Sequence, residues 1–534
     1  MGSVGVLDNI LIRIWFMKTI PNPVPSKGIS FSCLFAAMLL VLSACTTPSL
    51  KDELLPAPES FAREPATEGM LWTVAEGVMS QHGSDHSGFR LLDGSYDALA
   101  ARLALFDSAV SSLDVQTYLW YPDNSGRLLL ERAVEAAKRG VQVRLIVDDL
   151  LTIGQDQVIY ELNEHPNIEI LLFNPWKDRS VLARGGQMIA EMERLNQRMH
   201  DKLVIADGNA AIIGGRNIGD HYFGLNHDYN FHDIDVIGFG NIARQSNGMF
   251  DSFWNSEWVV SAINLDTEPD PEIARERWVK MQEKNRASAE LQAFGTEPYD
   301  WSDVLQKVAS ELHIGTSRLV YDEATGTTIS QNVLESVFPF MNEAQSELLV
   351  TNAYIIPGQP AIDFVNSLTK RGVRVRILTN SLESHDVPAV NSHYRDWRDD
   401  FIYAGAELFE LRADAAIQSI VDVPPVEAEF VGLHSKALVV DRSQVFIGSM
   451  NFDPRSAQIN TEMGAFIYSS GLAEELAQLM ERDMLPENAW QVLLDDKGKP
   501  YWTNSDRTVY KQPARSGSQR IMDKIFKVVP KEQY

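Results

Sequence analysis

The chain has 534 residues, 45% of them hydrophobic, and is long enough to form two domains that each bury a core. It carries 73 acidic residues against 47 Lys and Arg, for a net charge of −26, which argues against wide, nonspecific contact with nucleic acid. From the N-terminus, the first recognisable element is an apolar run over residues 29–42, preceded by Lys18 and Lys27. The run is too short to span a bilayer comfortably, so the pattern predicts a signal peptide.

The apolar run ends in Leu42-Ser43-Ala44-Cys45, which resembles the cleavage box of a bacterial lipoprotein. This predicts a signal peptide over residues 1–44, with Met17 as the expected start, and an anchor and linker over residues 45–87. Lipidation of Cys45 would anchor the chain to a membrane on the periplasmic side. Thr46 stands where an Asp would favour the inner membrane, so we expect the outer membrane. The alternative is an ordinary secretory signal in which Cys45 is incidental.

Helical and strand patterns alternate through the rest of the chain. Helices are predicted over residues 95–105, 126–139, 333–342 and 360–371, and strands over residues 113–118, 141–147, 168–173, 348–353 and 373–378. This alternation predicts an α/β fold with a mostly parallel sheet flanked by helices. Residues 266–296, which are charged and contain prolines, are predicted to form a helical linker.

Two segments carry the same polar pattern, H-x-K-x-x-x-x-D, followed ten residues later by an Asn. The first copy comprises His200, Lys202, Asp207 and Asn217, and the second comprises His434, Lys436, Asp441 and Asn451. A nucleophile, a cation and a neutral donor form the set of groups that a phosphate needs. Two copies with matched extensions therefore predict an enzyme that acts on phosphodiesters.

Each motif is predicted to form a β-hairpin, because an apolar, β-prone run precedes a turn signal and a second apolar run. With Gly208-Asn209 as a two-residue loop, Asn217 falls opposite His200 and Gly215 opposite Lys202. With Arg442-Ser443 as the loop, the second copy places Asn451 opposite His434 and Ser449 opposite Lys436. Strand alternation puts His200 and Lys202 on one face. Asp207 and Asp441 complete the catalytic motif but fall on the other face, where we expect them to stabilise the turns.

The repeat extends beyond the motifs. Residues 138–144 (KRGVQVR) resemble residues 370–376 (KRGVRVR), offset by 232 residues, and the two His residues are offset by 234. Duplication with a pseudo-twofold arrangement would bring the two half-sites together. We therefore predict lobe 1 over residues 88–262, a linker over 263–325, lobe 2 over 326–485 and a basic tail over 486–534.

The paired motifs resemble those of the phospholipase D superfamily. The runs Gly214 to Gly224 and Gly448 to Ser456 resemble more closely the bacterial cardiolipin synthase C type. The resemblance implies two similar lobes with an active site between them, chemistry without a metal or other cofactor, and a phosphohistidine intermediate. The implied reaction makes cardiolipin from phosphatidylglycerol, with phosphatidylethanolamine as a further candidate substrate, at a membrane. The alternative is hydrolysis to phosphatidic acid, as a phospholipase D or, less favoured by the charge, a nuclease.

The resemblance also implies a role for each residue. His200 is expected to be the nucleophile and His434 the general acid and base, while Lys202, Lys436, Asn217 and Asn451 hold the phosphate oxygens. Asp233 is expected to orient His434, with Asp235 as a competitor for that role, and Glu462 is expected to orient His200. Whether a partner protein is needed stays open.

Other polar groups of the sequence are candidates for sites or for surface and packing roles. His221, His227 and His232 match no zinc spacing and are interpreted as surface histidines. Asp148-Asp149 is interpreted as a polar rim near the cleft. Two basic segments are candidates for contact with anionic lipid, or else for solvated surface and lobe packing. The first comprises Lys177, Arg179, Arg184, Arg194 and Arg198, and the second spans residues 507–531, with seven Lys and Arg against one acid.

Overall fold

The computed structural model describes residues 49–527, except residues 52, 58, 153, 269 and 327. The predicted signal peptide and Cys45 lie outside the described residues, as does the end of the basic tail. No helix among the described residues is both long and apolar enough to cross a membrane.

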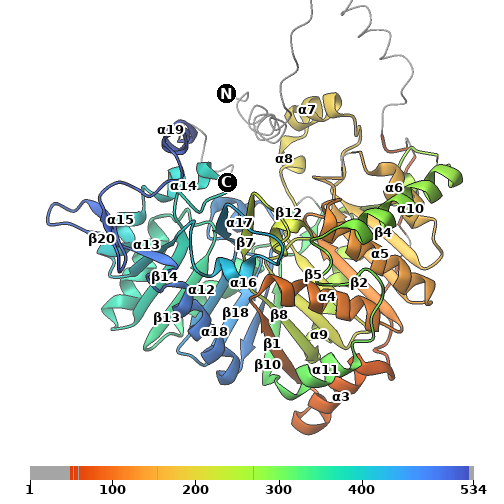
Figure 1. The fold of residues 1–534 in the computed structure, drawn as a ribbon, viewed down its shortest axis with the longest axis horizontal. Helices are drawn as coiled ribbons and strands as arrows, with labels where there is room; N and C mark the ends of the chain where they lie inside the picture. Colours follow the sequence, from red (N-terminus) through yellow and green to blue (C-terminus); the bar gives the residue numbers. More distant parts are fainter. Residues whose placement is uncertain are drawn as a thin grey trace, which may run out of the picture.

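An 18-stranded sheet runs through the molecule (Figure 1). Its first half has the order β1-β8-β6-β5-β2-β3-β4-β9, in which β2, β3 and β4 are parallel to one another and the other neighbours pair antiparallel. The bounds are β1 (His86–Leu92), β2 (Ser112–Thr117), β3 (Gln142–Asp148), β4 (Ile168–Phe173), β5 (Lys202–Ala206), β6 (Ala210–Gly214), β8 (Asp235–Gly240) and β9 (Val259–Ser261).

The second half repeats this order as β10-β19-β18-β17-β13-β14-β15-β20, extended by β21 and β22. The bounds are β10 (His313–Tyr321), β13 (Glu347–Asn352), β14 (Arg374–Asn380), β15 (Glu407–Leu411), β17 (Lys436–Val440), β18 (Gln444–Gly448), β19 (Met463–Tyr468), β20 (Ala489–Leu494), β21 (Pro500–Thr503) and β22 (Thr508–Val509). Antiparallel pairing of β1 with β10 joins the halves.

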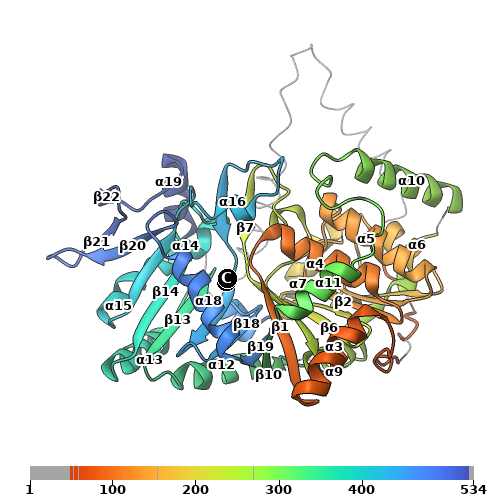
Figure 2. The same cartoon turned by 60° about the horizontal axis from the view of Figure 1, so that its bottom comes forward.

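Helices cover the sheet (Figures 1 and 2). The helices used below are α4 (Ser95–Ser108), α5 (Asn124–Lys138), α6 (Asp156–Asn163), α9 (Asn241–Trp254), α10 (Pro271–Ala287), α11 (Ser302–Ser310), α12 (Asn332–Asn342), α13 (Gln359–Lys370), α18 (Ser470–Asp483) and α19 (Gly517–Phe526). One buried apolar cluster includes residues of α9 and α18 together with strands of both lobes. Because this core is shared, the two lobes are packed as one unit.

The predicted α/β fold with two similar lobes is confirmed, and every predicted helix and strand is present within a few residues of its expected ends. The sheet differs from the prediction in two respects. Three strands in each half are parallel and the others antiparallel, because the motif hairpins β5–β6 and β17–β18 belong to it. The two lobes also share one continuous sheet.

Both hairpin loops are one residue longer than predicted. Ala206 pairs with Ala210, and Val440 pairs with Gln444. Asp207 and Gly208 adopt φ angles of 57° and 64°, in the left-handed region, so the turn begins at the aspartate. The register therefore shifts by one residue, and the predicted positions of Asn217 opposite His200 and Asn451 opposite His434 are wrong.

Candidate active site

The two motif histidines lie immediately before the strands β5 and β17, at the ends where the lobes meet. Short parallel backbone pairings cross between the lobes at these points. β7 (Tyr229–His232) pairs with β16 (Phe430–Leu433), and the His434 N–H then donates to the His232 carbonyl at 2.8 Å. On the other side Met199 pairs with Thr461, and the His200 N–H donates to the Thr461 carbonyl at 3.1 Å.

These pairings bring each histidine against an acid from the opposite lobe. His200 Nδ1 lies 3.1 and 3.0 Å from the two carboxylate oxygens of Glu462. His434 Nδ1 lies 2.6 Å from Asp233 Oδ2. The contacts fix the Nδ1–H tautomer and leave Nε2 of each ring free for chemistry. Asp235, the competitor for Asp233, instead pairs with Arg102 and Arg216.

The motif lysines are buried beside their histidines. Lys202 Nζ donates to the His200 carbonyl at 2.5 Å, and Lys436 Nζ donates to the His434 carbonyl and lies 3.1 Å from His434 Nδ1. Both side chains are almost completely buried. Two ammonium groups in so little water form a strong electrostatic attraction for an anion.

The two asparagines are also buried and follow the strands β6 and β18. Asn217 Oδ1 accepts from the Leu119 N–H at 3.3 Å, whereas Asn451 Oδ1 has no hydrogen-bond partner among the described residues.

Asp207 and Asp441 lie at the far ends of the motif strands, where they bind backbone. Asp207 accepts hydrogen bonds from the N–H groups of Val110, Ser111 and Ser112 at 2.7 to 3.1 Å. Asp441 accepts from the N–H groups of residues 345–347, each at 2.8 Å. Each aspartate thus ties the hairpin turn to the loop that precedes a neighbouring strand, the contacts expected of a structural residue rather than of a group that touches substrate.

The comparisons with known proteins agree with this arrangement. The family described as "Cardiolipin synthase, PLD-like domain" matches residues 103–254 and 337–484. The chain belongs to this family. It is 34% identical to Cardiolipin synthase C of Escherichia coli (strain K12) over 467 residues, 85% of this chain and 97% of that protein. An uncharacterized protein of Helicobacter pylori (strain J99) is 30% identical over 94% of this chain and 99% of its own.

A solved structure shares the fold. The crystal structure of phosphatidylserine synthase from Haemophilus influenzae Rd KW20 matches with a TM-score of 0.51 and 14% identity, covering 74% of this chain and 86% of that one. The family match and the 34% identity with Cardiolipin synthase C show that the protein is an enzyme of the phospholipase D superfamily.

Burial and the lysines control the protonation of this phospholipase D-type site. Burial, with the charges of Lys202 and Lys436, holds the pKa of His200 well below its ordinary value. Burial and Lys436 lower the pKa of His434 to about 4, and the Asp233 carboxylate opposes them. Both imidazoles are therefore neutral near pH 7 before substrate binds, and each is available as a nucleophile or base.

The two orienting acids are shifted in opposite directions. Burial raises the pKa of Asp233, but the interaction with His434 and the positive charges of Lys436 and Arg216 outweigh burial and hold the pKa below its ordinary value. Burial raises the pKa of Glu462 well above its ordinary value. Burial also lowers the pKa of Lys202 to about 7. Asp233 is thus an ionised partner for His434, whereas burial disfavours the charged form of Glu462.

Two tyrosines of the site were not predicted from the sequence, and neither was the contact that Ser449 makes. The Tyr118 ring lies edge-on to His200 at 5.1 Å between centroids, and Tyr222 lies similarly against His434 at 5.2 Å. The Ser449 hydroxyl donates to Glu462. The position of Tyr118 at the end of the predicted strand over residues 113–118 was a usable signal, because residues at strand ends line such sites.

Small residues beside the motifs make room for the orienting acids. A Cβ on Gly215 would lie 2.5 Å from a carboxylate oxygen of Asp233, closer than the two atoms can approach. The equivalent position in the second copy is Ser449, which contacts Glu462. Gly215 and Ser449, which were predicted to lie opposite the lysines, therefore adjoin the acids instead.

Two sequence interpretations are wrong, and for two residues of the first basic segment the packing alternative holds. His232 is fully buried and lies 2.7 Å from Asp483, whereas His227 is the surface histidine of its group. Asp148 and Asp149 are buried rather than on a rim. In the first basic segment, Arg198 pairs with Asp148 and Arg179 with Asp149, so these two are packing residues. No group of three His, Cys, Asp or Glu in the described part of the chain is placed to hold a metal.

Proposed function

We propose that the protein is a phosphatidyltransferase that makes cardiolipin from phospholipids through a phosphohistidine. The observation that carries the proposal is the pair of histidines, each held by a carboxylate of the opposite lobe and each beside a buried lysine. The family match and the 34% identity with Cardiolipin synthase C of Escherichia coli support it.

The first half-reaction forms a covalent bond to His200. Its Nε2 lone pair is available because Nδ1 faces Glu462. Nε2 attacks phosphorus and the bond to the leaving alkoxide breaks. His434, which takes up a proton on Nε2 when the anionic phosphodiester binds, gives that proton to the leaving oxygen. Lys202, Lys436 and the two asparagines donate to the non-bridging oxygens, where negative charge increases in the transition state.

The second half-reaction reverses the first with a different alcohol. His434, now neutral, takes the proton from the incoming hydroxyl, whose oxygen attacks phosphorus as the bond to His200 breaks. Phosphatidylglycerol as both donor and acceptor gives cardiolipin and glycerol, and phosphatidylethanolamine as donor gives ethanolamine. Water as acceptor gives phosphatidic acid, which is the hydrolase alternative.

One experiment separates transfer from hydrolysis. Purified protein is incubated with membranes containing labelled phosphatidylglycerol, with and without phosphatidylethanolamine, and the lipid products are separated. We expect cardiolipin as the main product, because lipid hydroxyls are concentrated at a membrane and a shielded cleft disfavours water. Phosphatidic acid as the main product on intact membranes would make the protein a phospholipase. Activity should survive EDTA; a loss that zinc or magnesium restores would overturn the metal-free mechanism.

We propose that the enzyme is a lipoprotein anchored through Cys45 to a membrane, facing the periplasm and preferably at the outer membrane. The sequence pattern of residues 42–45 supports this location. Changing Cys45 to Ser should release the chain from the membrane fraction or leave its precursor uncleaved. Unchanged fractionation together with an unchanged precursor size would contradict the anchor.

Helix α19 offers a second contact with the membrane. Ile521, Met522 and Ile525 are 61%, 41% and 55% exposed, with exposed Lys524 among them, while Asp523 faces inward and pairs with Arg395. Figure 1 shows α19 at the outer edge of the second lobe. An apolar face with basic neighbours is typical of a helix that lies on anionic lipid. The Ile521→Ser/Ile525→Ser variant should bind phosphatidylglycerol vesicles less than wild type in sedimentation, and Val304→Ser, an exposed apolar position on α11, should not.

A further inference from the structure

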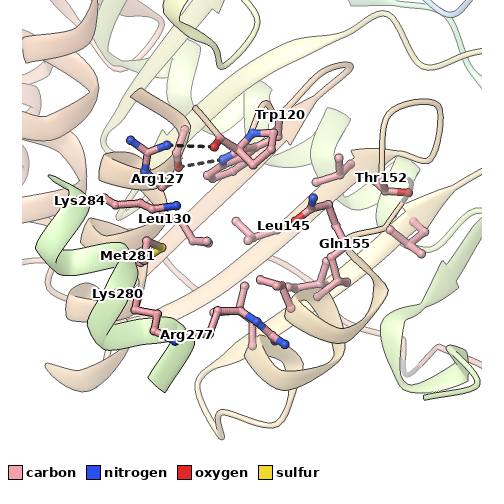
Figure 3. Close-up of a pocket in the computed structure, with 18 of the residues that line it drawn as sticks. Trp120, Arg127, Leu130, Leu145, Thr152, Gln155, Arg277, Lys280, Met281 and Lys284 are labelled. Atoms are coloured by element: carbon pink, nitrogen blue, oxygen red, sulfur yellow. Dashed lines mark hydrogen bonds between the residues drawn. The ribbon is translucent and has the colours of Figure 1, made fainter. Parts of the chain in front are cut away.

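A cavity of about 550 Å³ lies between α10 and the first lobe, on the side of α5 and α6 (Figure 3). Its walls come from the strands β3 and β4 and from the three helices. Most of the lining is apolar and includes Leu130, Leu145, Ile159, Leu162, Ile170 and Leu172. We call this space the α10 groove. Its volume is within the range of about 300–1,000 Å³ typical of small-molecule sites.

Polar contacts at its edges, together with the packing of Trp278 against the core of the first lobe, hold α10 over the groove. Arg277 donates to Glu161 of α6 at 2.6 Å, and Asn285 donates to Glu131 of α5 at 2.7 Å. Asn285 is the only residue of α10 that is buried. Ile273, which lines the groove, is 49% exposed. The helix thus spans an apolar space that it does not fill, and an apolar ligand would bury this surface.

The rim of the groove is basic in a strongly acidic protein. Four cations line it, Arg127, Arg277, Lys280 and Lys284, against the single carboxylate of Glu276. Arg277 is neutralised by Glu161, whereas Arg127 bonds only to neutral groups, Asn124, Asn285 and the Pro122 carbonyl. Lys284 has no hydrogen bond or ion pair within the described residues.

The free charges lie together at one end. Figure 3 shows Arg127, Lys284 and Trp120 around the same part of the groove, with Gln155 and the α6 side farther away. The Arg127–Asn285 hydrogen bond, 3.2 Å long, holds this corner closed. Two cations at the end of an elongated apolar space match the chemistry of an amphiphile with an anionic headgroup.

We infer that the α10 groove binds an anionic phospholipid, with one acyl chain beneath α10 and its phosphate at Arg127 and Lys284. Trp120 forms the wall at the headgroup end and follows Tyr118, the neighbour of His200, by two residues. The bound phosphate contacts different cations from those of the catalytic centre, so the groove holds a lipid in addition to the reacting one. The inference rests on the proposed function only in taking a phospholipid as the ligand.

Trp120 allows the groove to be tested directly. Phosphatidylglycerol with brominated acyl chains, presented in mixed micelles, quenches tryptophan fluorescence on contact. We expect saturable quenching, a measurable part of which disappears in Trp120→Phe. Brominated phosphatidylcholine should quench this component with an apparent affinity at least tenfold lower. Its zwitterionic headgroup is attracted less strongly by the positive charges of Arg127 and Lys284.

Two variants inside the groove and one control outside it distinguish the groove from the rest of the surface. Lys284→Glu should weaken the Trp120 component about tenfold, whereas Lys307→Glu, an exposed lysine of α11 outside the groove, should not change it. Met281→Asp should also remove the component by placing a charge among the acyl-chain contacts. Quenching that is insensitive to Trp120→Phe, or equal for both lipids, would overturn the inference.

The catalytic site serves as an independent readout. His200→Ala should keep the Trp120 quenching while losing turnover. If wild type makes no cardiolipin yet the quenching persists, the proposed function fails and the lipid site stands. If cardiolipin forms but the quenching is absent, the groove inference fails and the proposed function stands.

Discussion

The two half-sites have matching His, Lys and Asn residues at a constant offset of 234 residues, yet the acids that contact the imidazoles differ. His434 faces Asp233 at 2.6 Å, and burial fails to keep that carboxylate protonated because the contact with His434 and the charges of Lys436 and Arg216 stabilise its ionised form. His200 faces the longer Glu462 at about 3.0 Å, where burial raises the pKa of the acid. The duplicated motif has therefore produced two electrostatically different imidazoles.

This difference matches two different chemical tasks. An ionised Asp233 stabilises an imidazolium, so His434 takes up a proton more readily than His200 does. A general acid and base must change its protonation state in each half-reaction, whereas a nucleophile must stay neutral to attack. The geometry and charges thus favour His434 as the acid and base and His200 as the nucleophile.

The largest expected effect comes from the histidines themselves. His200→Ala and His434→Ala should each lower kcat by about 10³-fold or more on phospholipids, because each removes a required step. His227→Ala, a surface histidine, is the matched control and should keep wild-type rates. Near-wild-type turnover in either site variant would contradict a single site shared by the lobes.

The same variants separate the two roles. With a phosphodiester whose leaving group departs without protonation, His434→Ala should still form the covalent adduct on His200 and then stall. His200→Ala should form no adduct. Acid-quenched samples analysed by mass spectrometry decide the matter, and an adduct on His434 in the His200 variant would reverse the assignment.

The orienting acids should give unequal losses. Asp233→Asn removes the charge that stabilises the His434 imidazolium and should lower kcat by about 10²- to 10⁴-fold. Glu462→Gln keeps a carbonyl acceptor for His200 Nδ1–H in place of a carboxyl group whose charged form burial disfavours, so about a tenfold loss is expected. Equal losses, measured as kcat with KM determined separately, would show that the asymmetry has no role in turnover.

Variants of the small residues beside the acids test the same asymmetry, with smaller expected losses in kcat. Gly215→Ser puts a Cβ against Asp233 and should displace it, with a loss in kcat of about 10- to 100-fold. Ser449→Gly removes one hydroxyl donor from Glu462 and should cost a few-fold at most. Circular dichroism and thermal unfolding serve to exclude loss of the fold. A larger effect of Ser449→Gly than of Gly215→Ser would contradict the unequal roles of the two acids.

The sequence predicted the local elements and the site residues much better than the details of their contacts. The H-x-K motif and the apolar run that predicts the strand Ile168–Phe173 each lie within a few neighbouring residues. The sequence therefore displays both directly. The hairpin register was wrong because it depends on Asp207, whose carboxylate binds backbone almost one hundred residues away. The burial of His232 against Asp483 depends in the same way on packing between lobes. Such long-range contacts leave no local periodic signal.

The smallest expected effect is a change in proton affinity when substrate binds. The pKa of His434 is lowered to about 4 by burial and by Lys436, and a bound phosphodiester anion offsets the lysine charge. The pKa in the complex should therefore rise, by about one to two units. Between the free and bound pKa values the complex binds more protons than the free enzyme does. Binding thus takes up protons, and affinity falls as pH rises through that window.

Dimethyl phosphate is a suitable probe because it stays a monoanion throughout. Calorimetry in buffers of different ionisation enthalpy, between about pH 4 and 6, should reveal fractional proton uptake. His434→Gln should abolish most of that uptake, whereas His200→Gln should leave most of it, since the pKa of His200 is lowered well below its ordinary value and its partner Glu462 is a weaker anion. NMR of the His434 ring gives the pKa directly. Proton uptake that disappears in His200→Gln and persists in His434→Gln would assign the proton to the other half-site and reverse the comparison.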